Sequence, residues 1–328
     1  KDLRCGVSEK TINNVVKQTR RTQFSVPVFT CQLASPSEDH QAKMIGEKII
    51  DVKMDGSRVL SILYPDGRVE QYSRNGKVID NFLLIREQLA LLTKNIQVPT
   101  VFDGEVMSSS FQDLMKQMHR KDNVQTDDAV LHIFDVLPLD NFLKGKFDIS
   151  QLERRLQLKK FFDDIRNWAS FERVKNVVDV DFEIVNLSSD EGKARYHEIN
   201  RVAVEGGYEG IMIKDPNAPY ECKRTTSWLK LKPFITVDLE VIELQEGTGK
   251  YEGMLGALIC SGVDNDKKIT VNVGSGLLEE ERKFFWLNKE VILNKTVEIK
   301  ADAITHSQEE NDDYSLRFPV FMRIRDDK

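Results

Sequence analysis

Short apolar runs and amphipathic stretches alternate along the chain, and they predict a mixture of strands and helices. Strands are expected over residues 49–53, 58–64, 68–72, 101–107, 131–136, 210–214 and 228–232. Pro65, Asp66 and Gly67 stand between two of these runs and predict a hairpin. Because helices are few and short beside the strands, the pattern indicates an α+β fold rather than a doubly wound sheet.

Helices are predicted over residues 9–19, 81–93, 151–165 and 190–205. The apolar side of the second is expected to be formed by Phe82, Ile85, Leu89 and Leu92. The apolar side of the third is expected to be formed by Leu152, Leu156, Phe161 and Phe162. Ser189 precedes the fourth helix and is expected to cap it, because a serine hydroxyl can accept from the free amides of a first turn.

The pattern changes after Pro233. Strands are predicted over residues 237–246, 255–261, 269–273 and 297–305, with glycines between them and a helix over residues 278–288. Short strands, glycine turns and a helix suggest a small barrel of the oligonucleotide-binding kind. We therefore expect three parts: a helical segment and linker over residues 1–28, a domain over 29–234 and a barrel over 235–328.

The composition is that of a globular protein. The chain has 328 residues, 40% of them hydrophobic and 30% charged, which allows two domains with cores of their own. No apolar run is long enough to cross a bilayer, and no signal peptide is recognisable. Lys1 is not an initiator methionine, so we expect the chain to begin at a domain boundary.

The cysteine spacing and the net charge bear on whether the chain binds zinc or nucleic acid. The cysteines lie far apart and form no Cys-x-x-Cys pair, so free thiols in a reducing compartment are expected rather than a zinc site. They are Cys5, Cys31, Cys222 and Cys260. The formal net charge of −6 argues weakly against nucleic-acid binding. The acidic excess lies after residue 236, however, whereas the preceding part is nearly balanced and has room for a basic groove.

Lys53 is the first candidate for chemistry. It ends a predicted strand and begins the segment Lys53-Met54-Asp55-Gly56-Ser57-Arg58, just before the hairpin. A lysine at a strand end, beside a glycine that lets backbone approach a ligand, can serve as a nucleophile. Lys-x-Asp-Gly is a short pattern, however, and by itself it is more often a surface turn.

Further segments strengthen the catalytic interpretation. They are Ser73-Arg74-Asn75-Gly76, Asp103-Gly104-Glu105, Phe134-Asp135, Glu209-Gly210-Ile211-Met212-Ile213-Lys214 and Trp228-Leu229-Lys230-Leu231-Lys232. Each alone is more often a solvated charge than a site. Together they supply cations for phosphate, carboxylates for a metal ion and an aromatic platform.

In this order and spacing, the segments resemble the nucleotidyltransferase motifs of covalent ligases and capping enzymes. The finer resemblance is to ATP-dependent DNA ligases, above all the small phage type, and residues 73–76, 209–214 and 317–328 carry it. It covers residues 33–328, and residues 1–8 look like the end of the helical DNA-binding domain of such ligases. It implies an adenylation domain of antiparallel sheets with flanking helices, followed by an OB-fold β-barrel.

The resemblance implies roles in nucleotide binding. Lys53 would attack the α-phosphorus of ATP and carry AMP as a phosphoramidate. Asp51 would contact the adenine amino group, and Phe134 would stack on the ring. Val52 and Lys214 are also expected in the nucleotide site.

Other implied roles concern the metal, the sugar and the nick. Glu105 would bind the ribose hydroxyls and, with Glu209, a divalent ion, either Mg²⁺ or Mn²⁺. Arg58 would contact the ribose or the nick phosphate, and Arg74 would hold the 5′-phosphate of the nick.

The remaining implied roles concern the phosphates of ATP. Lys230 and Lys232 would bind the α-phosphate, and these neighbouring cations would favour the neutral, nucleophilic amine of Lys53. The residues expected to orient the leaving pyrophosphate are Arg323, Arg325, Asp327 and Lys328. Val320 stands where many relatives carry a basic residue, which puts one phosphate contact in doubt.

The implied function is the sealing of nicks in duplex DNA by a monomer that uses ATP, with no membrane partner and any sliding-clamp partner undefined. The compartment would be the cytoplasm of a bacterium or phage-infected cell, or a eukaryotic nucleus. RNA ligases, capping-type guanylyltransferases and inactive nucleic-acid-binding modules are the alternatives. Residues 317–328 argue against most RNA ligases, and residues 73–75 and 211–214 argue against capping enzymes. An NAD-dependent ligase is disfavoured because its four-cysteine zinc module has no counterpart.

Overall fold

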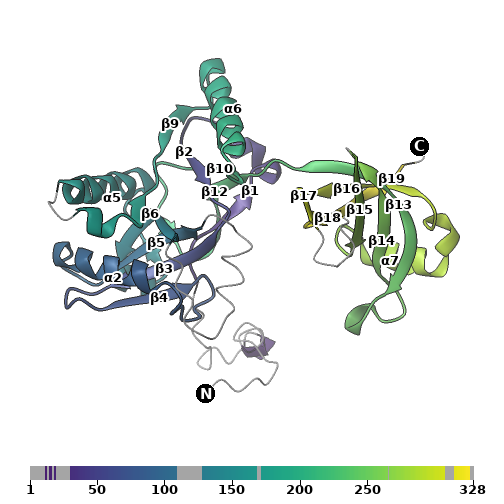
Figure 1. Cartoon of the computed structure of the whole chain (residues 1–328), viewed down its shortest axis with the longest axis horizontal. Coiled ribbons are helices and arrows are strands. Elements are labelled where there is room, and N and C mark those ends of the chain that lie inside the picture. Colours follow the sequence, from purple (N-terminus) through teal and green to yellow (C-terminus); the bar gives the residue numbers. More distant parts are fainter. Residues whose placement is uncertain are drawn as a thin grey trace. The chain divides into compact units, whose positions relative to one another are not determined.

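The computed structural model describes residues 12, 15, 16, 18, 19, 30–108, 128–167, 171–264, 266–306 and 314–325. The chain divides into two compact units, Lys1–Leu231 and Lys232–Lys328 (Figure 1). Ile12, Val15, Val16 and Gln18 are helical, and the rest of the segment expected over residues 1–28 lies outside the described residues except for Thr19.

The N-terminal unit contains two five-stranded sheets. The first has the order β1 (Leu33–Pro36), β12 (Arg224–Leu231), β10 (Gly210–Lys214), β2 (Glu47–Lys53) and β9 (Glu183–Asn186). The second has the order β4 (Val69–Ser73), β3 (Ser57–Leu63), β5 (Thr100–Met107), β6 (Val130–Pro138) and β8 (Val177–Asp179). Most strand pairs of the two sheets are antiparallel as expected, whereas β1–β12 and β6–β8 pair in parallel, so both sheets are mixed. Each parallel pair joins strands distant in sequence, which leaves enough chain for the crossover that such a pair needs.

Helices cover the outer faces of both sheets. Helices α2 (Leu83–Leu92) and α5 (Gln151–Arg166) pack on the second sheet, and α6 (Asp190–Glu205) packs on the first. Ser189 caps α6 as expected, since its hydroxyl accepts from the Gly192 amide. The shorter elements are η2 (Glu38–Lys43), η3 (Thr93–Asn95), α4 (Leu139–Leu143), η4 (Phe171–Val174) and the paired strands β7 (Lys146–Phe147) and β11 (Tyr220–Glu221).

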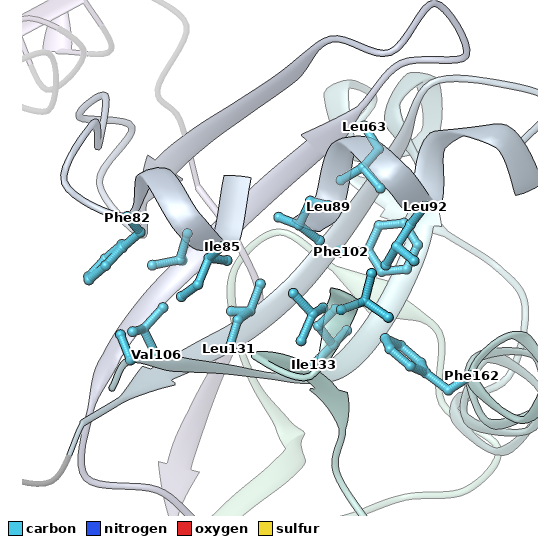
Figure 2. Close-up of a cluster of buried hydrophobic side chains, with 14 of the residues drawn as sticks. Leu63, Phe82, Ile85, Leu89, Leu92, Phe102, Val106, Leu131, Ile133 and Phe162 are labelled. Atoms are coloured by element: carbon cyan, nitrogen blue, oxygen red, sulfur yellow. The ribbon is translucent and has the colours of Figure 1, made fainter. Parts of the chain in front are cut away.

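Strand β3 shows how the layers meet. Its alternate residues Val59 and Leu63 enter the core under α2 and α5, which Figure 2 shows around Ile85, Leu89 and Phe162. Leu60 and Ile62 enter a second core, which also contains Trp228 of the first sheet. Both faces of β3 are therefore buried, one in each of the two cores.

The buried face of α5 differs from the expected one. Leu156 is 52% exposed, so its assignment to the apolar side was wrong. The buried residues are Gln151, Arg154, Arg155, Leu158, Phe162 and Ile165, which follow helical spacing. The buried face includes two arginines, which a search for apolar side chains at helical spacing does not detect.

The C-terminal unit is built on a seven-stranded sheet. Its order is β17 (Ala303–His306), β18 (Tyr314–Arg317), β15 (Lys267–Val273), β14 (Leu255–Asp264), β13 (Ile235–Glu246), β16 (Thr296–Ala301) and β19 (Val320–Ile324). Ser275, just after β15, forms a bridge with Val320 of the edge strand β19, so the sheet curls into a partial barrel. Helix α7 (Glu279–Leu287) and the short helices η5 (Gly249–Tyr251) and η6 (Lys289–Val291) complete the unit.

One expected strand of this unit is interrupted. Residues 297–305 were predicted as a single strand, but β16 ends at Ala301 and β17 begins at Ala303. The amide of Asp302 donates to the Arg317 carbonyl at the break. In the part of the chain that the structure describes, no helix has the length and apolar character needed to span a membrane.

Candidate active site

A cavity of about 520 Å³ lies in the N-terminal unit, and both sheets contribute to its walls. A cavity of this size suits a small-molecule ligand. The expected site residues that line it are Asp51, Val52, Lys53, Arg58, Arg74, Glu105, Phe134, Lys214 and Lys230. Val180, Arg224 and Trp228 also line it, although the sequence did not single them out for this role.

Lys53 and Glu209 meet because their strands are neighbours. Lys53 ends β2 and pairs with Gly210 at the start of β10, and the Glu209 amide donates to the Lys53 carbonyl at 2.8 Å. This register brings the two side chains together, and Lys53 Nζ forms an ion pair with Glu209 Oε2. Both side chains are largely shielded from solvent. The amine of Lys53 is therefore held inside the cavity beside a carboxylate.

Gly56 permits close packing directly after Lys53. A Cβ at this position would lie 2.2 Å from the backbone oxygen of Val106 on β5. The sequence suggested that this glycine lets backbone approach a ligand. The close neighbour is instead another strand, so the glycine allows the turn after Lys53 to lie against β5.

Arg58 is fixed by a buried carboxylate. Its Nε and Nη2 donate to Asp103 Oδ1 and Oδ2 at 2.8 and 2.6 Å, and Nη1 donates to the Gln32 carbonyl at 2.7 Å. The Tyr220 hydroxyl donates to the same Asp103 at 2.7 Å. Burial alone would lower the pKa of Arg58, but Asp103 beside it raises that pKa well above the usual range. The Asp103 side chain is fully buried, and these partners explain how the burial of a carboxylate is tolerated.

Glu105 lies opposite Arg58 in the register of β3 and β5. Burial raises the pKa of its carboxyl to about 7, although Lys53 and Arg58 act in the opposite direction. A carboxyl with this pKa is poised to gain or lose a proton near neutrality.

A buried ion pair forms another part of the wall. Lys214 Nζ lies 2.6 Å from Asp51 Oδ2, and both side chains are almost completely buried. The same Nζ lies 5.1 Å from the ring centre of Phe134 and 4.8 Å from that of Trp228. Burial lowers the pKa of Lys214, against the raising effect of Asp51. The acid, the cation and the ring that were expected in the nucleotide site are thus mutual neighbours.

Two buried arginines of α5 form hydrogen bonds with Phe134, Val180 and Asp135, and the first two of these residues line the cavity. Arg154 donates to Asp135 through Nε and Nη2, at 2.8 and 3.0 Å. Arg155 donates to the backbone oxygens of Phe134 and Val180, both at 2.5 Å. Sequence reasoning missed both arginines, although their position on the buried side of the helical repeat was a usable signal.

The remaining expected residues lie in the C-terminal unit or outside the described residues. Lys232 follows the end of β12, and its Nζ lies 3.1 Å from Asp302 Oδ2. Arg323 Nε donates to Glu298 at 2.8 Å, and Arg325 Nη1 lies 3.0 Å from Asp238 Oδ2. Asp327 and Lys328 lie outside the described residues.

Metal binding by protein groups alone is not evident. Among the described residues, no group of three or more histidine, cysteine or acidic side chains is placed to hold a metal ion. Glu105 and Glu209 both lie near Lys53, however, and the charge of Glu209 contributes to the raised pKa of Glu105.

Residues 30–232 match the family profile described as the ATP dependent DNA ligase domain. Residues 246–325 match the DNA ligase OB-like domain. DNA ligase 2 of Methanosarcina mazei is 28% identical over 90% of this chain and 54% of its own length. A DNA ligase of Methanococcus maripaludis is 32% identical over 98% of this chain and 60% of its own length. The chain therefore spans little more than half the length of these relatives.

Solved structures with a similar fold also include ligases. The one named Pmar-Lig_Pre has 46% identity and a TM-score of 0.89, covering 100% of this chain and 74% of its own. A Lig E DNA ligase, described as binding DNA with a minimal scaffold, has a TM-score of 0.65, covering 90% of this chain and 99% of its own. At 22% identity, this second likeness speaks for the fold alone.

Proposed function

Because the chain belongs to the family of ATP-dependent DNA ligases, we propose that it joins 3′-hydroxyl and 5′-phosphate ends at nicks in duplex DNA, using ATP. One observation carries the proposal: the cavity gathers the Lys53 amine, cationic side chains and the Phe134 ring in one place. An amine nucleophile, phosphate-binding charges and an aromatic ring are what the transfer of AMP to a lysine requires.

In the first step the Lys53 amine attacks the α-phosphorus of ATP. A new N–P bond forms, the bond from the α-phosphorus to the bridging oxygen breaks, and pyrophosphate leaves with the bonding electron pair. The amine must be neutral to attack, whereas a free lysine has a pKa near 10.4 and is mostly protonated at neutral pH. Lys53 must therefore leave its ion pair with Glu209 and lose a proton before the step.

The purine would occupy the part of the cavity beside Phe134. The ring of Phe134 offers a stacking surface, and the Asp51 carboxylate can accept from an exocyclic amine. Adenine carries such an amine at position 6, whereas guanine has a carbonyl oxygen there that an ionised carboxylate repels. This pairing of ring and acid favours ATP over GTP.

The phosphates would lie toward Lys53, Arg74 and Lys230. All three side chains line the cavity. Phosphoryl transfer depends mainly on positioning and on neutralising the phosphate charge, and fixed cations achieve both. Arg58 is held rigidly by Asp103, so it can contribute a cation whose position does not change during the reaction.

Glu105 and Glu209 are the residues that would hold a divalent ion. Mg²⁺ is bound by one or two carboxylates together with phosphate oxygens and water, and these two carboxylates fit that donor set. The raised pKa of Glu105 fits as well, because a nearby cation would stabilise its ionised form. When bound, such an ion would neutralise phosphate charge.

The later steps would use the same lysine site. AMP would pass from Lys53 to the 5′-phosphate of the nick, and the 3′-hydroxyl would then displace AMP to form the phosphodiester bond. Arg74, which lines the same cavity as Lys53, is the proposed partner of the nick phosphate.

Covalent labelling tests the proposal. The chain is incubated with ATP or GTP labelled at the α-phosphate, denatured and separated by electrophoresis. We expect label from ATP, little from GTP, and none with Lys53→Ala. Lys48→Ala, at the other end of the same strand, is the matched control and should label normally. Label that persists in Lys53→Ala would refute the assignment of the nucleophile.

A nick-sealing assay completes the test. A DNA duplex with a single nick should be joined in the presence of ATP and a divalent ion. A chain that takes up AMP but joins only RNA strands would favour the RNA ligase alternative.

A further inference from the structure

Arg155 connects parts of the cavity wall without lining the cavity itself. Its side chain is about 1% exposed and enters from α5. Nη1 donates to the Phe134 carbonyl, Nη2 donates to the Val180 carbonyl, and Nη1 lies 3.7 Å from Asp51 Oδ2. Phe134, Val180 and Asp51 all line the cavity and come from different parts of the fold. One guanidinium therefore contacts three residues of the cavity wall.

The chemistry of these contacts requires an arginine. A guanidinium is a flat, permanently charged fork whose donors diverge, so it can reach several acceptors at once. The ring of Phe182 lies 4.9 Å from its central carbon and restricts its movement further. A lysine ammonium at the same place is a point charge and cannot span the two carbonyls and the carboxylate together.

The contacts to Asp51 are selective. Lys214 and Arg155 both approach Oδ2, and within the described residues no hydrogen bond is donated to Oδ1. Asp51 is thus held through one oxygen, while the other can accept from a ligand that enters the cavity. The carbonyl of Phe134 is held by the same guanidinium, so the ring and the acid are fixed relative to each other.

We propose that Arg155 is a positioning residue that sets the selectivity of the site for a 6-aminopurine, by holding the Phe134 ring and the Asp51 carboxylate in register. This inference rests on the proposed function, because it assigns Phe134 and Asp51 to the base of ATP. Arg155 itself touches neither the nucleotide nor the reacting atoms.

Arg154 provides a matched control on the same helix. It is the neighbouring residue and equally buried, and its guanidinium contacts Asp135, Gln151 and the carbonyls of Ile149 and Ala218. None of these partners lines the cavity. A purely structural role for buried arginines of α5 would make Arg154 and Arg155 behave alike.

The experiment compares Arg155→Lys with Arg154→Lys. The rate of lysyl-nucleotide formation is measured over a range of ATP and of purine riboside triphosphate, which lacks the 6-amino group. Losing a hydrogen bond to a charged group changes affinity by about 10-fold or more. Arg155→Lys should therefore raise KM for ATP by about 10-fold, with a change of less than about 2-fold for the analogue and in kcat. Arg154→Lys should lower the melting temperature and leave the ratio of the two KM values as in the wild type.

Several results would overturn the proposal. A wild-type chain that treats both nucleotides alike, or an equal rise in both KM values in Arg155→Lys, would each do so. If Arg155→Lys does not fold, Phe182→Ala removes the ring that lies against the guanidinium and should shift the KM ratio in the same direction by a smaller factor. An unchanged ratio in that variant would also contradict the proposal. Absence of any covalent label in the wild type would instead refute the proposed function.

Discussion

The Glu105 carboxyl lines the cavity and has a pKa close to neutrality. Its folded-state pKa of about 7 lies above the ordinary value of 4.5 because the carboxyl is buried. Folding therefore favours the protonated form. The stability that this form provides is fully present below pH 4.5 and is lost as pH rises toward 7.

Glu105→Gln should remove this pH dependence. The quantity to follow is the free energy of unfolding of the wild type minus that of the variant, in a metal-free buffer. This difference should fall by about 2–3 kcal/mol between pH 4.5 and pH 8, because one pKa unit corresponds to about 1.4 kcal/mol. Urea unfolding at several pH values measures this difference. A constant difference across the range would show that the Glu105 carboxyl has an ordinary pKa in the folded chain.

At the residue scale, the sequence predicted the groups that line the cavity better than the partners that hold them. Lys53, Glu105 and Phe134 stand in short recognisable segments, so they could be named in advance. The contact of Arg58 with Asp103 spans 45 positions, and that of Tyr220 with Asp103 spans 117. Such pairs depend on strand register and sheet packing, which the local pattern does not encode.

At the element scale, α5 shows where a sequence pattern fails. The helix itself was predicted almost to its ends, but the rotation of its buried face was not. Apolar periodicity alone placed Leu156 inside, whereas the burial of Arg154 and Arg155 turns that residue toward solvent. Buried arginines are tolerated here because Arg154 has the carboxylate of Asp135 and Arg155 has carbonyl acceptors.

Paired alanine substitutions test the phase of this helix. Leu158→Ala removes a side chain from the core and should lower the free energy of unfolding by about 2–5 kcal/mol. Leu156→Ala alters a side chain that is about half exposed and should change it by less than about 0.5 kcal/mol. Chemical denaturation of both variants measures the contrast. Equal losses would mean that the helix packs with the face first inferred from its sequence.

At the scale of the whole molecule, the short strands and frequent glycines after Pro233 predicted a second domain. In the structure, the chain divides into compact units between Leu231 and Lys232. Lys53 and the other residues that line the cavity belong to the first unit, whereas Arg323 and Arg325 belong to the second. The short strands and glycine turns predicted the barrel-like curl of this sheet, but not the bridge between Ser275 and Val320, because that contact depends on how strands distant in sequence pack.

The division into units leads to a prediction about the stages of ligation. Pyrophosphate leaves only when AMP is loaded onto the lysine, and the sealing of a nick that already carries AMP does not involve it. If Arg325 orients pyrophosphate, as the resemblance implies, Arg325→Ala should slow lysyl-AMP formation by about 10-fold or more, the usual cost of losing a charge-assisted contact. The same variant should seal a pre-adenylated nick at nearly the wild-type rate. Single-turnover assays of the two stages measure this separation.

The contacts of Arg325 define the competing outcome. Its guanidinium lies 3.0 Å from Asp238 and 3.6 Å from Glu298, so it also stabilises the C-terminal unit. Arg323 shares the Glu298 partner but is 64% exposed, and exposed ion pairs contribute little to stability. Arg323→Ala therefore serves as the comparison for the loss of one ion pair on this sheet. If Arg325→Ala slows both stages equally and lowers the melting temperature more than Arg323→Ala does, Arg325 acts by holding β13, β16 and β19 together rather than on pyrophosphate.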